Sequence, residues 1–193
     1  MKIFTIFWAY LAQTQSRFLR VLHLAIALFV IIQILNSNGI QGDAVAQVNE
    51  VGMRLNFTWM HIVIGIMLFL LSLVLTAYCL FTRGVKYFYP YLWGDFSQIK
   101  RDLKQILRLN FPEASPKGLA ACVQGLGLGA LLLVVLSGLS WFLLSRMNVS
   151  WAANVLGLHK TLTALIEVYI FAHGGMGILH VILSHYMKKG VLR

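Results

Sequence analysis

Four long stretches of apolar residues dominate the hydropathy pattern of the chain. They cover about residues 20–36, 57–81, 119–144 and 152–183. Each is nearly free of charged side chains and is comparable in length to the roughly 20 residues that a helix needs to cross a bilayer. The last stretch is longer than that, so we expect it to tilt or to protrude. The pattern predicts an all-α membrane protein, in which a four-transmembrane-helix bundle forms a single domain over residues 1–193.

A shorter amphipathic segment at about residues 97–109 separates the second and third stretches. Its apolar residues follow the i, i+4, i+7, i+8 spacing of one helix face: Ile99, Leu103, Ile106 and Leu107. Basic residues occupy the other faces, which predicts a basic amphipathic helix lying on the inner leaflet. Two interpretations of this helix stay open, namely attachment to anionic lipid alone and docking of a partner protein.

Composition and charge agree with a membrane protein. The chain is 59% hydrophobic and only 11% charged, and its mean hydropathy is +0.78. A net charge of +10 could indicate nucleic-acid binding, but thirteen of the sixteen basic residues fall in the N-terminal segment, the 82–118 loop and the C-terminus. The exceptions are Arg54, Arg146 and Lys160. The positive-inside rule therefore predicts that both termini and the 82–118 loop are cytoplasmic, with lipid rather than nucleic acid as a partner.

Two cysteines and the first residues of the chain add little to this picture. Cys79 and Cys122 lie near the predicted inner ends of apolar helices, on the reducing side, which argues against a disulfide. No C-x-x-C-H motif occurs, so a covalently attached c-type haem is excluded. We expect the aromatic-rich segment 1–12 to be retained as an interfacial segment.

Two histidines on the fourth stretch carry the strongest chemical signal. His159 and His173 are fourteen residues apart, a rotation about 40° short of four full helical turns. They therefore share one helix face, separated by about 21 Å along the axis. The ligands of one metal ion must all lie within about 2 Å of it, so these two imidazoles cannot serve one ion. Their spacing suits two stacked prosthetic groups.

Histidines on the first two stretches lie at matching depths. His61 and His159 are both near the outer ends of their helices, whereas His23 and His173 are toward the inner side. Depth alone predicts the pairs His23–His173 and His61–His159. Two bis-histidine sites in a helical bundle are a natural way to hold two b-type haems, with neutral imidazoles as axial ligands of the iron. The alternative for any one histidine is a hydrogen bond between helices or a proton path, and the count stays open between one and two haems.

Four basic residues lie where haem propionates would need partners. Arg54 and Lys160 are near the outer pair in sequence, and Arg17 and Arg20 are near the inner pair. The alternative is that all four are ordinary interface charges of a membrane protein.

Three further polar residues remain without an assigned role. His180 lies seven residues after His173 and would replace it as a ligand if the helix sat higher in the membrane. Otherwise we expect His180 and His185 to be interfacial, near a propionate, a quinone or lipid headgroups. Glu167 lies inside an apolar helix, where an acidic residue is a functional candidate by default, either for proton transfer or for an interhelical hydrogen bond.

Small residues on the third stretch have two possible roles. Gly125, Gly127 and Gly129 are spaced two residues apart. Such residues let another helix approach closely, or they make room for a flat ligand beside the backbone.

Taken in order, four segments resemble the prokaryotic cytochrome b561 superfamily, over roughly residues 17–187. The segments read RVLHLAIALFVIIQIL, FTWMHIVIGIMLFLL, SPKGLAACVQGLGLGALLLVVLSGLSWF and LGLHKTLTALIEVYIFAHGGMGILH. The most specific element is the His-x13-His pattern on the last helix, combined with one histidine on each of the first two. The superfamily includes the di-haem cytochrome b subunits of nickel–iron hydrogenases and formate dehydrogenases.

The resemblance implies a multi-pass cytochrome of the bacterial inner membrane that passes electrons between the quinone pool and a partner redox protein carrying haem or iron–sulfur centres. By matching positions, His23 and His173 resemble the ligands of the inner haem, and His61 and His159 those of the outer haem. Such a chain would be the electron-transfer subunit of a quinone-linked oxidoreductase.

The resemblance also implies a quinone site near the inner haem, at the start of the third helix. In this sequence that position corresponds to Ser115, Lys117 and Gly118. Two alternative functions stay open. One is a stand-alone quinone oxidoreductase of the same fold, for example one that oxidises superoxide, and the other is a haem-free carrier that uses His and Glu as proton relays.

Overall fold

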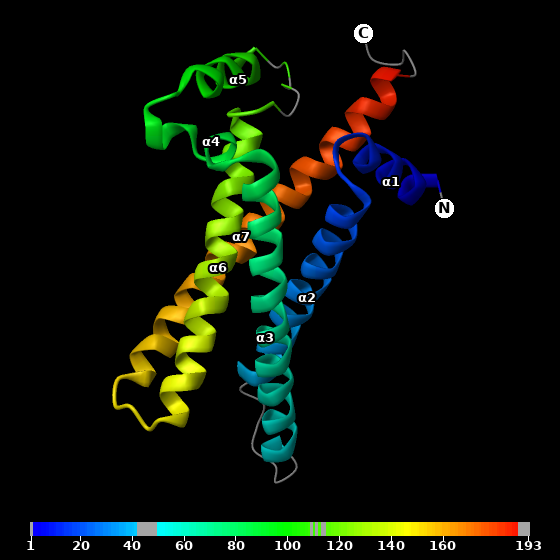
Figure 1. Cartoon of the computed structure of the whole chain (residues 1–193). Helices are drawn as coiled ribbons and strands as arrows, with labels where there is room; N and C mark the ends of the chain where they lie inside the picture. Colours follow the sequence, from blue (N-terminus) through cyan, green and yellow to red (C-terminus); the bar gives the residue numbers. More distant parts are fainter. Residues whose placement is uncertain (1, 42–49, 109, 111, 113–114, 189–193) are drawn as a thin grey trace.

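The computed structural model describes residues 2–41, 50–108, 110, 112 and 115–188. Helices account for almost all of them, and no strand occurs in these ranges. The elements are α1 (Lys2–Thr14), α2 (Arg17–Gln41), α3 (Glu50–Arg83), α4 (Val85–Phe88), the 3₁₀ helix η1 (Pro90–Trp93), α5 (Ser97–Leu107), α6 (Leu119–Arg146) and α7 (Ala152–Lys188) (Figure 1).

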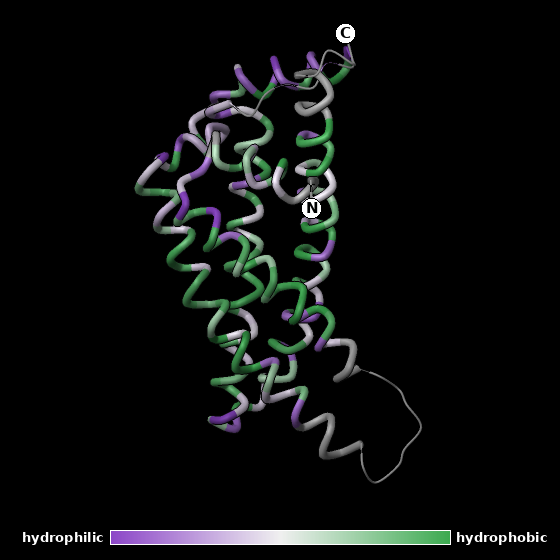
Figure 2. Tube along the Cα trace, turned by 90° about the vertical axis from the view of Figure 1, so that its right-hand side faces the viewer, coloured by the Kyte–Doolittle hydropathy of each residue, from purple (hydrophilic) through white to green (hydrophobic). Residues whose placement is uncertain are grey.

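Four helices are long and apolar enough to cross a membrane. These spans lie in α2, α3, α6 and α7, with mean hydropathy between 1.6 and 2.6. Hydrophobic residues dominate the middle of the bundle and hydrophilic residues gather toward its two ends (Figure 2). The chain is thus a multi-pass membrane protein, and the predicted fold class, an all-α bundle with four transmembrane helices, is confirmed.

The core lies where the four long helices meet. Leu22 and Ile26 of α2, Leu68 of α3 and Leu131 of α6 are all buried there, as is Ile166 of α7. The outward faces carry exposed large apolar side chains such as Val168 and Phe171. Extensive exposed apolar surface of this kind fits contact with lipid rather than with water.

One end of the bundle gathers most of the smaller elements. The helices α1, α4 and α5 and the C-terminal end of α7 all lie there (Figure 1). We call it the α5 end. The guanidinium of Arg20 lies 4.7 Å from the ring centroid of Trp8, which ties α1 to the start of α2. The predicted cytoplasmic location of this end stays a prediction.

The apolar residues of α5 differ in exposure, because they do not all face the bundle. Ile99 and Ile106 are partly buried, whereas Leu103 and Leu107 are 50% and 78% exposed. The reason is that the face turned toward the bundle is centred on Asp102, which is only 2% exposed. The helix therefore docks on the bundle through a polar residue, and part of its apolar surface remains free.

Asp102 caps the first turn of α6. Its Oδ2 accepts a hydrogen bond from the backbone N–H of Leu119 at 2.7 Å, and its Oδ1 accepts one from Nε2 of Gln98 at 2.7 Å. A carboxylate at a helix N-terminus satisfies an otherwise unpaired N–H and interacts favourably with the helix dipole. Gly118 leaves the necessary space, because a Cβ atom there would collide with Asp102 and would lie 2.6 Å from Oγ of Ser115.

Removing this carboxylate should loosen the α5 end of the bundle. We expect Asp102→Ala to lower the free energy of unfolding by about 1–3 kcal/mol, because it leaves buried N–H donors unpaired. The measurement is denaturant unfolding in detergent, followed by circular dichroism. Gln105→Ala, on the exposed side of the same helix, serves as the control and should change stability by less than about 0.5 kcal/mol. Equal effects of the two substitutions would contradict the capping role.

Candidate functional site

Two pairs of histidines face each other inside the bundle. The ring centroids of His23 on α2 and His173 on α7 are 6.0 Å apart, with an interplanar angle of 69°. Those of His61 on α3 and His159 on α7 are 6.2 Å apart, with an angle of 81°. The structure thus brings together the same partners that depth in the membrane predicts, at two levels along α7.

The separation within each pair suits two ligands on opposite sides of one metal ion. Two metal–imidazole bonds of about 2 Å, plus about 1 Å from each nitrogen to its ring centre, add up to about 6 Å. No group of three or more His, Cys, Asp or Glu side chains that could hold a metal ion occurs among the described residues. A porphyrin needs no such cluster, since it supplies four nitrogens of its own and leaves only the axial positions to the protein.

A cavity of about 340 Å³ surrounds the inner pair. His23 and His173 both line it, and most of its other walls are aliphatic side chains of all four long helices, such as Ile26, Leu75 and Leu131. Ligand and cofactor sites are usually apolar cavities of several hundred Å³ with a few polar groups. The side chain of His23 is thus exposed to this cavity rather than packed against neighbouring atoms.

Tyr169 orients the inner histidine of α7. Its ring lies parallel to that of His173, with centroids 5.0 Å apart and an interplanar angle of 9°. The tyrosine ring fits against α6 at Gly127, where an added Cβ atom would collide with it. Gly127 therefore makes room for a side chain of α7, and Gly125 does the same for Phe88 and Tyr89. The glycines of α6 thus serve close packing, while Gly129 has open space beside it.

The outer histidine of α7 rests in a polar notch of α6. Nδ1 of His159 lies 3.1 Å from the carbonyl oxygen of Val134 and 3.0 Å from Oγ of Ser137. Donation of the Nδ1 proton to that carbonyl leaves Nε2 as the free lone pair, which is how an orienting hydrogen bond selects the tautomer of a metal ligand. A Cβ atom on Gly138 would lie 3.0 Å from Cε1 of His159, so glycine leaves the ring its space.

His61 has less support from its surroundings. Its backbone oxygen accepts a hydrogen bond from Nε2 of Gln33 at 2.8 Å. Its Nδ1 is buried without a hydrogen-bond partner, as is Oε1 of Gln33. The outer pair therefore combines one firmly held imidazole, that of His159, with one whose ring nitrogen is still unsatisfied.

The basic residues predicted beside the two pairs have varied positions. Arg20 stacks on Trp8, and its Nε is buried without a hydrogen-bond partner, while Arg17 is exposed. Neither lines the inner cavity. Lys160 is exposed on α7 next to His159. The side chain of Arg54 lies outside the described part of the structure.

Three polar residues that do line the cavity escaped the sequence analysis. They are Gln15, Arg83 and Gln124, from the α1–α2 connection, the end of α3 and the start of α6. A signal for Arg83 was present, since it follows Leu75 and Cys79 at four-residue intervals, on the same face of one helix. From charge alone, Arg83 is one of the basic residues of the 82–118 loop that the positive-inside rule explains.

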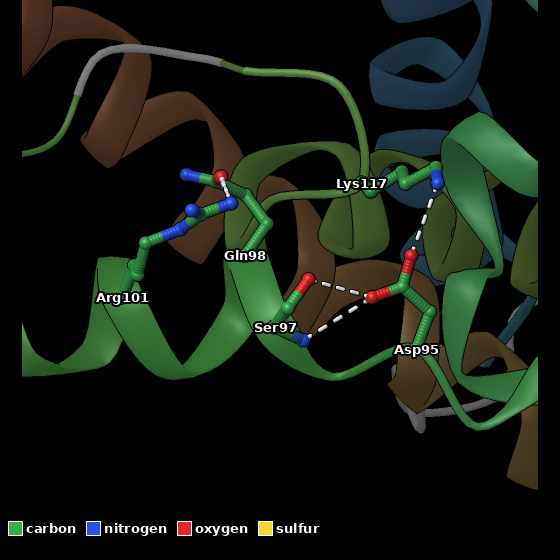
Figure 3. A network of polar contacts seen from close by, with 5 residues as sticks. All are labelled: Asp95, Ser97, Gln98, Arg101 and Lys117. Atoms are coloured by element: carbon green, nitrogen blue, oxygen red, sulfur yellow. Dashed lines mark hydrogen bonds and ion pairs between the residues drawn. The ribbon is translucent and has the colours of Figure 1, made fainter.

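The predicted quinone segment forms a polar network with the loop before α5 (Figure 3). Lys117 makes a 3.0 Å ion pair with Oδ2 of Asp95, whose Oδ1 accepts hydrogen bonds from the backbone N–H and hydroxyl of Ser97 at 3.3 and 2.7 Å. Oγ of Ser115 is buried without a hydrogen-bond partner, and Gly118 packs against Asp102. Hydrogen bonds from Ser97 and then Lys117 hold the pKa of Asp95 at about 2.

The remaining candidates lie away from the histidine pairs. Nε2 of His180 is 3.3 Å from the carbonyl oxygen of Pro112, which places His180 beside the loop that follows α5. His173, not His180, faces His23. The side chain of His185 is outside the described residues. Glu167 is exposed on α7 and makes no hydrogen bond with another described residue, so the structure shows no interhelical bond for it.

These features define a class of protein: a helical membrane bundle with two pairs of facing histidines at different levels. The family model for prokaryotic cytochrome b561 matches residues 14–190. No curated protein and no solved structure matches the chain. The chain belongs to the prokaryotic cytochrome b561 family, whose members are membrane cytochromes that bind haem b and transport electrons.

Filling the space beside His159 should disturb the outer site alone. We expect Gly138→Val to displace the imidazole and to lower the haem content of the purified protein by about one haem per chain, because the added side chain occupies the space of the ring. Pyridine haemochrome absorbance per mole of protein gives the count. Gly129→Val, at a position with open space, is the matched control and should retain the wild-type haem content. A Gly138→Val protein with unchanged haem content would contradict the role of this notch.

The hydrogen bonds around Asp95 predict how two substitutions change the pKa of its carboxyl group. Because Asp95 has a pKa of about 2 against an ordinary value of 3.8, its hydrogen bonds persist at pH 4 and are lost as the pH falls through about 2. We expect Ser97→Ala and Lys117→Met each to raise this pKa, since both side chains donate hydrogen bonds to the carboxylate. Carboxyl-carbon NMR of Asp95 measures both values. An unchanged pKa in either variant would contradict the corresponding contact.

Proposed function

We propose that this chain binds two haem b groups, one between each histidine pair, and carries electrons across the membrane between the quinone pool and a partner redox protein. The observation that carries the proposal is the separation of the imidazole rings, 6.0 Å in one pair and 6.2 Å in the other, at two levels of one helix. Family membership supports the same cofactor. The ligands we propose are His23 with His173, and His61 with His159.

The residues of the chain have distinct roles in this function. The haem groups, when bound, supply the one-electron chemistry. The four imidazoles would bind and orient them, and the Val134 carbonyl would hold the Nδ1 proton of His159 so that its Nε2 remains free. The buried aliphatic side chains around the inner pair exclude water, which lets the surroundings tune the reduction potential. Electrons would then cross the apolar layer without a row of charged side chains.

The two ends of the bundle have different proposed partners. The α5 end, rich in basic residues, would face the cytoplasm of a cell whose inner membrane holds the protein. The quinone would bind near the inner haem, where Ser115 has a buried hydroxyl oxygen without a hydrogen-bond partner and where Lys117 and Gly118 adjoin it. Arg54 and Lys160 remain the residues predicted to meet the outer haem's propionates, whereas Arg17 and Arg20, predicted beside the inner haem, do not line its cavity. A haem or iron–sulfur protein would exchange electrons at the outer side.

Ligand substitution tests the proposal directly. The purified wild-type chain should contain two haems, and His61→Ala and His173→Ala should each contain about one, because a six-coordinate iron that loses one of its two protein ligands is weakly held. The measurement is pyridine haemochrome absorbance per mole of protein. His180→Ala, which alters a histidine that contacts Pro112 instead of another imidazole, is the control and should retain both haems.

Other outcomes would support other functions. A colourless wild-type protein would favour the haem-free carrier, and two haems in both ligand variants would refute the pairing. Superoxide-dependent quinone reduction by the purified chain alone would identify a stand-alone oxidoreductase rather than a subunit.

A further inference from the structure

The cavity beside His23 and His173 has one polar end. Much of its wall is aliphatic, with residues such as Val30, Ile31 and Ile166. Gln15, Arg83 and Gln124 come from the α1–α2 connection, the last residue of α3 and the start of α6, which are the ends of these elements nearest the α5 end. A cavity of this kind fits a ligand that is apolar over most of its surface and polar along one edge.

Arg83 is the one side chain with a permanent charge among the cavity-lining residues. Its Nη1 donates to the hydroxyl of Tyr87 at 3.5 Å, and its guanidinium carbon lies 5.2 Å from the centre of that ring. These contacts hold the arginine in place but leave most of its five N–H donors free. A partly buried guanidinium gains stability from a hydrogen-bonding partner, and most from an anion.

No carboxylate of the described residues serves as that anion. Asp95 pairs with Lys117, Asp102 accepts from Leu119 and Gln98, and Glu167 lies exposed within the span of α7. Most N–H donors of Arg83 at the polar end of the cavity therefore have no acceptor among the described residues.

We propose that Arg83 is the cationic partner of a carboxylate of the ligand in this cavity, with the side-chain amide N–H groups of Gln15 and Gln124 as neutral donors. This inference rests on the proposed function, since the ligand would be the inner haem and the carboxylates its propionates. It assigns the carboxylate edge of that haem to the α3 side of the α5 end, rather than to Arg17 and Arg20 at the start of α2. A guanidinium binds a carboxylate through two parallel N–H···O bonds, which would also fix the rotation of the macrocycle within the cavity.

The test compares haem b with its dimethyl ester, which has the same ring but no carboxylate. The protein carries His61→Ala, so that only the inner site binds, and the haem-free chain in detergent is titrated with each compound and followed by absorbance. We expect the protein with Arg83 to bind haem b at least about ten-fold more tightly than the ester, the size of one charge-assisted hydrogen bond. Arg83→Gln should bind the two compounds equally well, and Arg83→Lys should retain part of the preference.

A matched control removes another cation at the same end. Lys86 is exposed, lies three residues after Arg83, stacks on Trp93 and does not line the cavity. Lys86→Gln should keep the full preference for haem b, because its charge acts only through solvent. Loss of the preference in Arg20→Gln but not in Arg83→Gln would place the carboxylates at α2 and overturn the inference.

The outcomes separate this inference from the proposed function. Failure of the His61→Ala protein to bind any haem would refute the haem site itself. Binding of haem b and the ester with equal affinity would leave the haem site standing and refute the role of Arg83. That second comparison needs no substitution at Arg83, so equal affinities refute the inference even where Arg83→Gln does not fold, and Arg83→Lys with Arg20→Gln then identifies the residue behind any preference.

Discussion

The pairing of imidazoles across the bundle is the contact around which the other helices are arranged. An apolar membrane interior offers few nitrogen donors, and here α7 presents two of them on one face. The helix α2 must therefore cross α7 at the level of His173, and α3 must reach it at the level of His159. The aliphatic core fills the space that remains between these two levels.

A hydrogen bond and an ion pair of carboxylate side chains hold the elements at the α5 end together. Asp102 joins α5 to the first turn of α6, and the Asp95–Lys117 ion pair joins the preceding loop to the same region. The Asp95–Lys117 pair precedes the α6 span, and Asp102 contacts only the first residue of that span, Leu119, so both contacts order the loops without placing charge in the middle of the lipid layer. Phe88 of α4, in the same region, lines the inner cavity together with Arg83.

Much of this architecture was predictable because membrane helices have long, simple patterns. Apolar length indicated the four spans, and depth along each span indicated which histidines would meet. The rest depended on how each helix is rotated about its axis, which hydropathy does not reveal when every face is apolar. For that reason Arg83 could be recognised as an interface charge but not as a residue lining the cavity. The apolar pattern of α5 gave no sign that Asp102 is buried, because Asp102 is held by α6, a helix that follows it in the sequence.

The helix that contributes no imidazole nevertheless shapes both sites. Through Gly127, α6 admits the aromatic ring that lies against one donor, and through Val134, Ser137 and Gly138 it cradles another. The space beside the two histidines of α7 therefore depends on the absence of side chains at two positions of α6, not on charge or coordinating chemistry. A single methyl group added on α6 would shift the surroundings of an imidazole while leaving all four histidines unchanged.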